Sequence, residues 1–198
     1  MRTYPILPLA CFLLSACGSA ADESAAPAAT TNTEATSGAE SADATPTAAV
    51  QAATAVATLE SKSESHVTGT IRFRQSADGV EVTADLAGLT PNTKHGFHVH
   101  ETGDCSAADG TSAGGHWNPA GVPHALPPAA SRHAGDMGNL TSDADGKVHV
   151  TETFHGFELA GPNSVVGRAV IVHAKEDVGS QPSGDAGARV ACGVIVAE

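Results

Sequence analysis

The sequence predicts an all-β fold, an antiparallel sandwich or barrel, for residues 55–198. Apolar and polar residues alternate along the candidate strands, Gly-rich and Asp-Gly turns separate them, and no long helical pattern occurs. The composition agrees, because 21 glycines in 198 residues are typical of a turn-rich chain. A segment of this length can enclose a sizeable core.

Charge and histidine content limit the range of possible functions. The chain carries 22 acidic and 10 basic side chains, a formal charge of −12. A chain this acidic lacks the basic surface that nucleic acids require, so we expect no nucleic-acid partner. Ten histidines in so short a chain are the unusual feature.

Residues 1–16 have the features of a lipoprotein signal peptide. One arginine precedes about ten apolar residues, too few to span a bilayer, and residues 14–18 (LSACG) resemble the bacterial lipoprotein cleavage box. On this prediction Cys17 becomes the lipidated first residue of an envelope protein that faces the periplasm. Gly18 is not the aspartate associated with inner-membrane retention, which favours the outer membrane. An ordinary secretory signal is the alternative, and it also exports the protein.

The rest of the N-terminal region is predicted to be a flexible tether. Export of the protein also predicts the state of its cysteines. Residues 17–54 are expected to be the lipidated cysteine and a disordered linker, because Ala, Thr and Ser dominate and no Lys, Arg or aromatic residue occurs. Export leads to an oxidising compartment. Cys11 leaves with the signal and Cys17 takes lipid, so Cys105 and Cys192 are expected to form a disulfide. A reactive free thiol is the alternative.

The folded segment opens with a hairpin. Residues 67–74 and 80–86 each alternate with period two, and a turn at 77–79 joins them. Further strands are expected at 95–101, 147–154, 165–173 and 190–196. Residues 102–135 show neither a helical nor a strand period, and a loop of this length in a compact domain is usually functional.

The histidines have the spacing of metal ligands. His98 and His100 lie in one strand, so both imidazoles project from the same face and can meet one ion, while Phe97 and Val99 face the core. Further candidate ligands follow in the chain: His116, His124, His133, Asp136 and His173. These residues can form two four-ligand sites if one histidine is shared, and copper(II) and zinc favour such donors. Taken alone, the first pair would more simply be two imidazoles on a solvated strand.

The segments around these residues resemble the copper/zinc superoxide dismutase family, in its bacterial exported lipoprotein form. The matching segments occur in the family's order over residues 55–198: 98–100 (HVH), 115–119 (GHWNP), 132–139 (RHAGDMGN), 172–173 (VH) and 188–193 (ARVACG). The resemblance implies a flattened, eight-stranded Greek-key barrel with long metal-binding and electrostatic loops. It implies one copper and one zinc per subunit. The implied reaction is dismutation of superoxide to dioxygen and hydrogen peroxide, which protects the cell envelope.

The resemblance also implies a role for each candidate residue. Copper would be bound by His98, His100, His116 and His173, and zinc by His116, His124, His133 and Asp136. His116 would therefore bridge the metals and carry a proton during turnover. Asp177 would hydrogen-bond one ligand of each metal. Arg189 would guide the anionic substrate, and Cys105 and Cys192 would form the family's disulfide.

Two features depart from the family's pattern. The segment 174–188 carries a single cation, Lys175, and has Gln181-Pro182-Ser183 in the stretch where many relatives place a lysine. We therefore expect this loop to contribute little to electrostatic steering of the anionic substrate. The family's dimer contacts differ between its classes, so a homodimer is among the expected partners without a specified interface.

Other interpretations are less consistent with the sequence. Residues 110–114 (GTSAG) fit the serine-hydrolase pattern, but no buried strand precedes them and no helix follows. Residues 143–146 (DADG) hint at a calcium loop, but they lack its length and its terminal Glu, so we expect a hairpin turn. The remaining histidines are expected to be surface or core residues: His66, His95, His149 and His155. A copper/zinc-binding lipoprotein without dismutase activity is the functional alternative; the presence of Arg189 argues against it.

Overall fold

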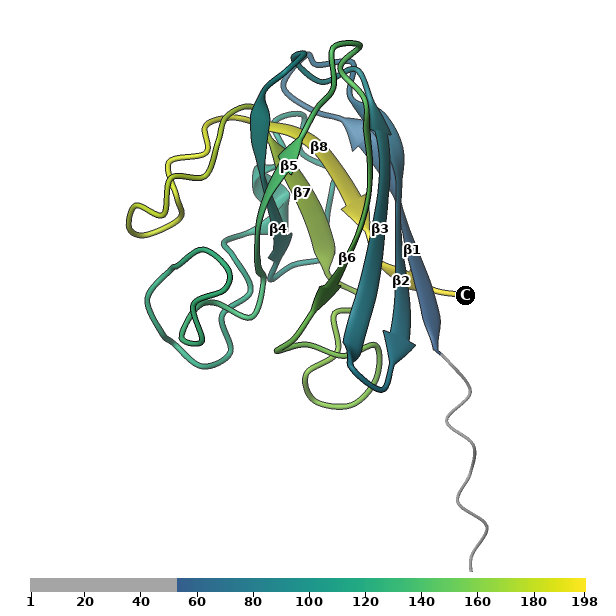
Figure 1. Ribbon diagram of the computed structural model, residues 1–198, viewed down its shortest axis with the longest axis vertical. Helices are drawn as coiled ribbons and strands as arrows, with labels where there is room; N and C mark the ends of the chain where they lie inside the picture. The colour runs from purple at the N-terminus through teal and green to yellow at the C-terminus, as the bar shows by residue number, and fades with distance from the viewer. Residues whose placement is uncertain (1–52) are drawn as a thin grey trace, which may run out of the picture. The chain divides into compact units, whose positions relative to one another are not determined.

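Alternation of buried residues with more exposed ones produces the predicted hairpin. β2 (Thr68–Ser76) and β3 (Gly79–Ala87) pair antiparallel along their whole length, as predicted. The computed structural model describes residues 53–198, and Figure 1 shows that this part of the chain forms a barrel of strands. The predicted signal peptide and almost all of the predicted linker lie outside the described residues.

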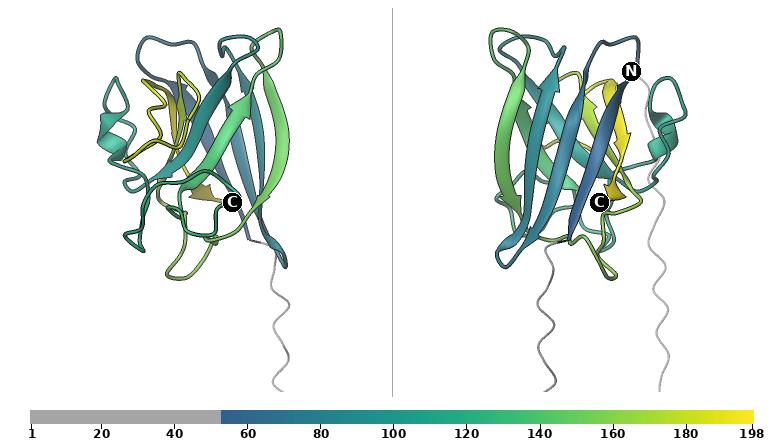
Figure 2. Two further views of the ribbon diagram at one scale, coloured as in Figure 1. Left: turned by 60° about the vertical axis from the view of Figure 1, so that its left-hand side comes forward. Right: turned by 90° about the vertical axis from the view of Figure 1, so that its right-hand side faces the viewer.

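Eight strands follow one another around the barrel in the order β5-β4-β7-β8-β1-β2-β3-β6. The remaining bounds are β1 (Thr54–Ser61), β4 (Lys94–His100), β5 (Asp136–Thr141), β6 (Val148–Phe154), β7 (Ala169–His173), β8 (Arg189–Val194) and a short β9 (Val196–Ala197) that pairs with β1. β5 and β6, at the two ends of this order, contact each other without a ladder between their described residues. The barrel is therefore nearly closed, and the right-hand view of Figure 2 shows a yellow C-terminal strand beside the dark blue β1. The predicted all-β, eight-stranded antiparallel fold is confirmed.

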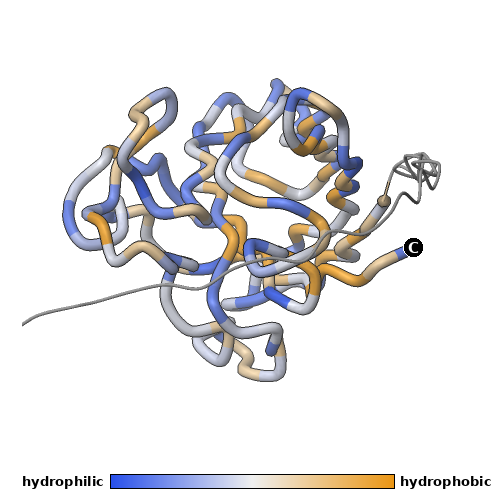
Figure 3. Tube along the Cα trace, turned by 90° about the horizontal axis from the view of Figure 1, so that it is seen from below, coloured by the Kyte–Doolittle hydropathy of each residue, from blue (hydrophilic) through white to orange (hydrophobic). Residues whose placement is uncertain are grey.

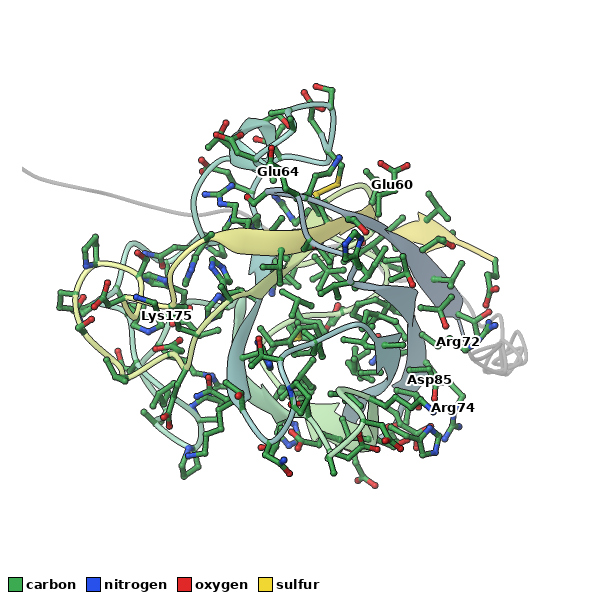
Figure 4. The ribbon with its side chains drawn as sticks, turned by 90° about the horizontal axis from the view of Figure 1, so that it is seen from above. Glu60, Glu64, Arg72, Arg74, Asp85 and Lys175 are labelled. Atoms are coloured by element: carbon green, nitrogen blue, oxygen red, sulfur yellow. A yellow bond between two sulfur atoms is a disulfide. The ribbon has the colours of Figure 1, made fainter. Side chains whose placement is uncertain are left out.

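One hydrophobic core fills the barrel. Phe73 of β2, Phe97 of β4 and Val172 of β7 are among its buried members, and Val99 is fully buried beside them. Figure 3 shows hydrophobic and hydrophilic stretches alternating along the chain, as strands with one buried face require. On β2 and β3 the opposite face is polar, and Figure 4 shows Arg72, Arg74 and Asp85 projecting outward from the sheet.

Two long connections leave the barrel on the side of β4 and β5, residues 101–135 and 174–188 (Figure 1). The first contains only a 3-10 turn, Thr111–Ala113, and one isolated bridge between His116 and His100. The Cys105–Cys192 disulfide, with 5.7 Å between its Cα atoms, ties this loop to β8 and confirms the predicted pairing. Within residues 53–198, no helix has the length and apolar character needed to cross a membrane.

The structure shows what two of the weaker motif matches form, residues 110–114 and 143–146. Ser112 of the hydrolase-like pattern lies in the 3-10 turn, where its hydroxyl donates a hydrogen bond to the Asp104 carbonyl at 2.8 Å. Residues 143–146 form a turn in which the Asp143 carboxylate accepts from the N–H groups of Asp145 and Lys147. The prediction of a hairpin there is wrong, because β5 and β6, which the turn joins, do not pair.

Candidate metal centre

β4 presents two imidazoles on one side and apolar residues on the other. His98 and His100 are 0% and 1% exposed, while Phe97 and Val99 belong to the hydrophobic core, as the alternation predicts. β4 is hydrogen-bonded to β5 on one edge and to β7 on the other, so its histidines sit on a rigid surface.

The neighbouring strands lose their regular register next to this surface. The β4–β5 pairing shifts between Gly96 and His98, and the β7–β8 pairing shifts between Val172 and His173. Such irregularities re-aim side chains and are frequent beside functional sites. The second shift places His173 at the end of β7 opposite Arg189 of β8.

Main-chain hydrogen bonds attach the 101–135 loop to β4. The Trp117 N–H donates to the Val99 carbonyl and the Val99 N–H to the Gly135 carbonyl, each at 2.9 Å. A Cβ at residue 135 would lie 2.2 Å from the Val99 carbonyl oxygen, so only glycine permits this approach. His116 thereby comes beside His100, to which it forms an isolated bridge.

The seven candidate ligands converge into two groups that share His116. In each group one ligand atom per residue lies within 4.8 Å of every other: His98, His100, His116 and His173 in the first, and His116, His124, His133 and Asp136 in the second. The structure therefore brings together all of the residues that the sequence singled out as ligands.

The hydrogen bonds of these histidines fit metal ions. Each of the six rings keeps one buried nitrogen without a hydrogen-bond partner: His98 Nδ1, His100 Nε2, His116 Nε2, His124 Nδ1, His133 Nδ1 and His173 Nε2. In several rings the other nitrogen is bonded, as in His100, whose Nδ1 donates to the Gly114 carbonyl at 3.0 Å. A buried polar atom without a partner costs free energy of folding. Six such nitrogens gathered in two groups therefore indicate sites that bind metal ions and not an ordinary packed core.

The second group has the donors of a tetrahedral zinc site, at short distances from one carboxylate. Carboxylate oxygens of Asp136 lie 2.8 Å from His116 Nδ1, 2.9 Å from His124 Nδ1 and 3.2 Å from His133 Nδ1. A tetrahedral zinc site with bonds of about 2.0–2.1 Å has ligand–ligand edges of roughly 3.3 Å. Three nitrogens and one carboxylate at these distances match the donors that zinc accepts.

Asp177 connects the two groups. Its carboxylate accepts from His98 Nε2 at 2.7 Å and from His124 Nε2 at 3.1 Å. Asn139 holds the Asp177 main chain in turn, accepting from its N–H at 2.7 Å and donating to its carbonyl at 2.9 Å. Burial alone would raise the pKa of Asp177, but the hydrogen bonds from His98, the Gly179 N–H and His124 lower it well below its usual range. The carboxylate is therefore charged and orients one ring from each group.

Arg189 lies beside the first group, opposite His173 in the β7–β8 pairing. Its Nη1 and Nη2 atoms donate to the carbonyls of Gly110 and Gly114, each at 2.7 Å. The Gly114 carbonyl also accepts from His100, so one backbone oxygen positions both a candidate ligand and the guanidinium. Burial lowers the pKa of Arg189, but a guanidinium stays charged in proteins.

Comparison with known proteins decides the family. A family model described as copper/zinc superoxide dismutase matches residues 67–195, well over half of the chain. The chain belongs to the copper/zinc superoxide dismutase family. An extracellular superoxide dismutase [Cu-Zn] of Brugia pahangi is 41% identical over 153 residues, which cover 72% of this chain and 75% of the relative. A superoxide dismutase [Cu-Zn] of Paramecium bursaria Chlorella virus 1 is 43% identical over 140 residues, 67% of this chain and 74% of the relative.

Membership of this superoxide dismutase family gives the chemistry of the centre. The chain is a superoxide dismutase, and copper and zinc are its cofactors. Together with the disulfide, the extracellular relative points to a protein that functions outside the cytoplasm, in the envelope or beyond it.

Burial keeps three imidazoles of the dismutase's first group neutral before any metal binds. It lowers the pKa of His98 to about 4, although the hydrogen bond that His98 donates to Asp177 opposes the shift, and it lowers the pKa of His173 to about 3. Burial also lowers the pKa of His100 well below 6.5. Metal ligands must be unprotonated, so these rings are ready to bind at neutral pH.

These pKa values predict that the metal-free dismutase loses stability in mild acid. Between pH 6.5 and about 4 the unfolded chain binds protons at His98 and His173 that the folded protein refuses, so the free energy of unfolding must fall as the pH falls. Denaturant unfolding of the metal-free protein at pH 7.5, 6.5, 5.5 and 4.5 measures the effect. The His98→Gln variant should show a shallower decline, and an unfolding midpoint that is constant over this range would contradict the prediction.

Several supporting residues of the dismutase site are not predicted by the sequence. Asn139 occurs in the sequence only as part of a family motif, with no role assigned to it. Gly110 and Gly114 act through backbone carbonyls, and a residue's type does not predict what its carbonyl binds. His95 was expected to be structural; it is 1% exposed, and its Nδ1 lies 2.9 Å from the His173 carbonyl oxygen. His66, His149 and His155 are exposed, as expected for surface histidines.

Proposed function

We propose that this superoxide dismutase is a lipid-anchored protein of the bacterial cell envelope, whose copper is held by His98, His100, His116 and His173 and whose zinc is held by His116, His124, His133 and Asp136. The observation that supports these ligand sets is the group of six buried imidazole nitrogens without hydrogen-bond partners, arranged in two groups around His116. The folded domain is proposed to begin at residue 55, after a signal peptide over 1–16 and a lipidated linker over 17–54.

The reaction converts two superoxide anions and two protons into dioxygen and hydrogen peroxide. Copper supplies the one-electron redox chemistry of both halves, and zinc, which has no redox chemistry, supplies structure. The protein must therefore attract an anion, place it and deliver protons.

Arg189 is proposed to receive the anion. Two of its nitrogens are occupied by backbone carbonyls, which fix the plane of the guanidinium, and its charge does not depend on pH. A fixed cation beside the copper ligands raises the local concentration of a small anion and aligns it.

His116 is proposed to carry a proton. Its Nδ1 lies 2.8 Å from Asp136, another of the proposed zinc ligands, while its Nε2 faces the copper group and is buried without a hydrogen-bond partner. Nε2 would thus be the atom that takes up a proton and gives it to the departing peroxide, and the ring would keep its position because Nδ1 stays bound in the zinc site.

Envelope protection and membrane anchoring form part of the proposal. The basis for the anchor is the sequence at 14–18, and export agrees with the disulfide. Cys17→Ser should release the protein from membranes into the soluble fraction. The homodimer expected from the family is a separate question, which sedimentation of this released variant tests.

Superoxide decay tests the proposal directly. The chain loaded with one copper and one zinc should accelerate decay, and the zinc-only form should not. Fast decay that requires copper supports the proposal. Full occupancy of both sites without catalysis would mean that the protein is a metal carrier.

A further inference from the structure

The 174–188 loop binds both main-chain groups of His124. The Gln181 side chain donates from Nε2 to the His124 carbonyl at 2.7 Å, and its Oε1 accepts from the His124 N–H at 3.1 Å. Within residues 53–198, Gln181 supplies both of the hydrogen bonds that the His124 main chain makes. One side chain thus fixes the backbone of one candidate zinc ligand.

The ring of His124 is held from the same loop. Asp177, four positions before Gln181, lies 3.1 Å from Nε2, and the ring is buried, with the residue 2% exposed. Since a charged carboxylate accepts the Nε2 proton, Nδ1 is left with its lone pair, 2.9 Å from Asp136 Oδ2. Asp177 determines the tautomer of the His124 ring and fixes the position of Nε2. The position of Nδ1 depends in addition on where the His124 backbone lies.

The residue type at position 181 suits this role. A lysine, which many relatives are expected to have in this stretch, offers donors only and could not bind the N–H of His124. An amide carries a donor and an acceptor side by side, as binding one residue's N–H and C=O requires. The position therefore contributes a fixed attachment between two loops in place of a mobile charge.

We propose that Gln181 is a positioning residue for the zinc site, which holds the His124 backbone so that Nδ1 is aimed at the ion. The inference rests on the proposed zinc ligands. It means that the 174–188 loop, expected from the family to act on the substrate through charge, acts in this chain on metal retention as well.

Zinc affinity of the full chain tests the inference. Gln181→Met keeps the length of the side chain and removes both hydrogen bonds; we expect it to bind zinc about tenfold to a hundredfold more weakly, the usual effect of losing a partner that orients a ligand. Ser183→Ala, an exposed position two residues along the same loop, is the matched control and should bind zinc as the wild type does. Copper affinity, measured on zinc-loaded protein, should stay within about twofold, because His124 is not in the copper set.

A spectroscopic measurement separates positioning from general damage. Cobalt(II) in the zinc site reports ligand geometry through its visible absorption, which Gln181→Met should change and Ser183→Ala should not. Wild-type zinc affinity and an unchanged cobalt spectrum in Gln181→Met would overturn the inference, and so would a parallel loss of zinc and copper affinity. If His124→Ala leaves zinc binding intact, the proposed zinc set itself is wrong, whatever Gln181 does.

Discussion

Arg189→Ala is expected to lower kcat/KM for superoxide about tenfold to a hundredfold without loss of copper or zinc. The residue contributes no ligand atom to either group, so the metals should remain bound. On the proposed assignment it supplies the fixed positive charge beside the copper ligands, and focusing by such a charge changes encounter rates by about 10–10³. The dismutation rate should be measured at several ionic strengths, with metal content determined on the same samples.

Two variants make the result specific. Arg189→Lys keeps a charge but loses the planar fork that binds the Gly110 and Gly114 carbonyls, so its rate should fall between those of the wild type and the alanine variant. Lys175→Ala removes a cation from the 174–188 loop, labelled in Figure 4, and should have the smaller effect. An unchanged rate in Arg189→Ala would remove this residue from the mechanism.

Removing the disulfide is expected to cost roughly 4–5 kcal/mol of the free energy of unfolding. Cys105 and Cys192 are 87 residues apart, so the bond restricts a long loop of the unfolded chain. Denaturant unfolding of the metal-free Cys105→Ala/Cys192→Ala variant measures the loss. Alanine is preferred to serine because Cys192 is fully buried and a hydroxyl there would need a partner.

The same substitution should also disturb the site. Cys105 anchors the loop whose Gly110 and Gly114 carbonyls hold Arg189, so the variant should lose dismutation rate in addition to stability. Reduced wild-type protein is the control and should unfold at the same denaturant concentration as the variant. An unfolding midpoint equal to that of the oxidised wild type would show that the bond does not stabilise the fold.

Strong alternation explains which strands the sequence predicts. β2 and β3 are found because large apolar residues such as Phe73 alternate with charged ones. β1 is not predicted, because its buried positions include Ala55 and Ala57, whose small side chains give little contrast. β5 is not predicted either, because it begins at Asp136 and contains Gly138 at φ 86°, residue types that strands disfavour.

The same reasoning divides the site into predictable and unpredictable parts. The candidate ligands could be found because metal coordination requires particular side chains, and His98 and His100 have the spacing of one strand face. Gln181 could not be found, since its partner is a backbone 57 residues away that only the folded loops bring near. The family resemblance suggested a lysine within residues 181–183, so departures from a family pattern are worth examining individually.

The separation of the copper-site candidates along the chain has a consequence for the order of events during biosynthesis. His98 lies in β4 and His173 is the last residue of β7. These two strands pair directly, although the whole 101–135 loop, β5 and β6 lie between them in the sequence. A chain that emerges from its N-terminus first cannot complete the four-residue copper group until β7 has appeared. The centre therefore matures after nearly all of the barrel has been synthesised, and a truncated product that ends before β7 should be unable to sequester copper there.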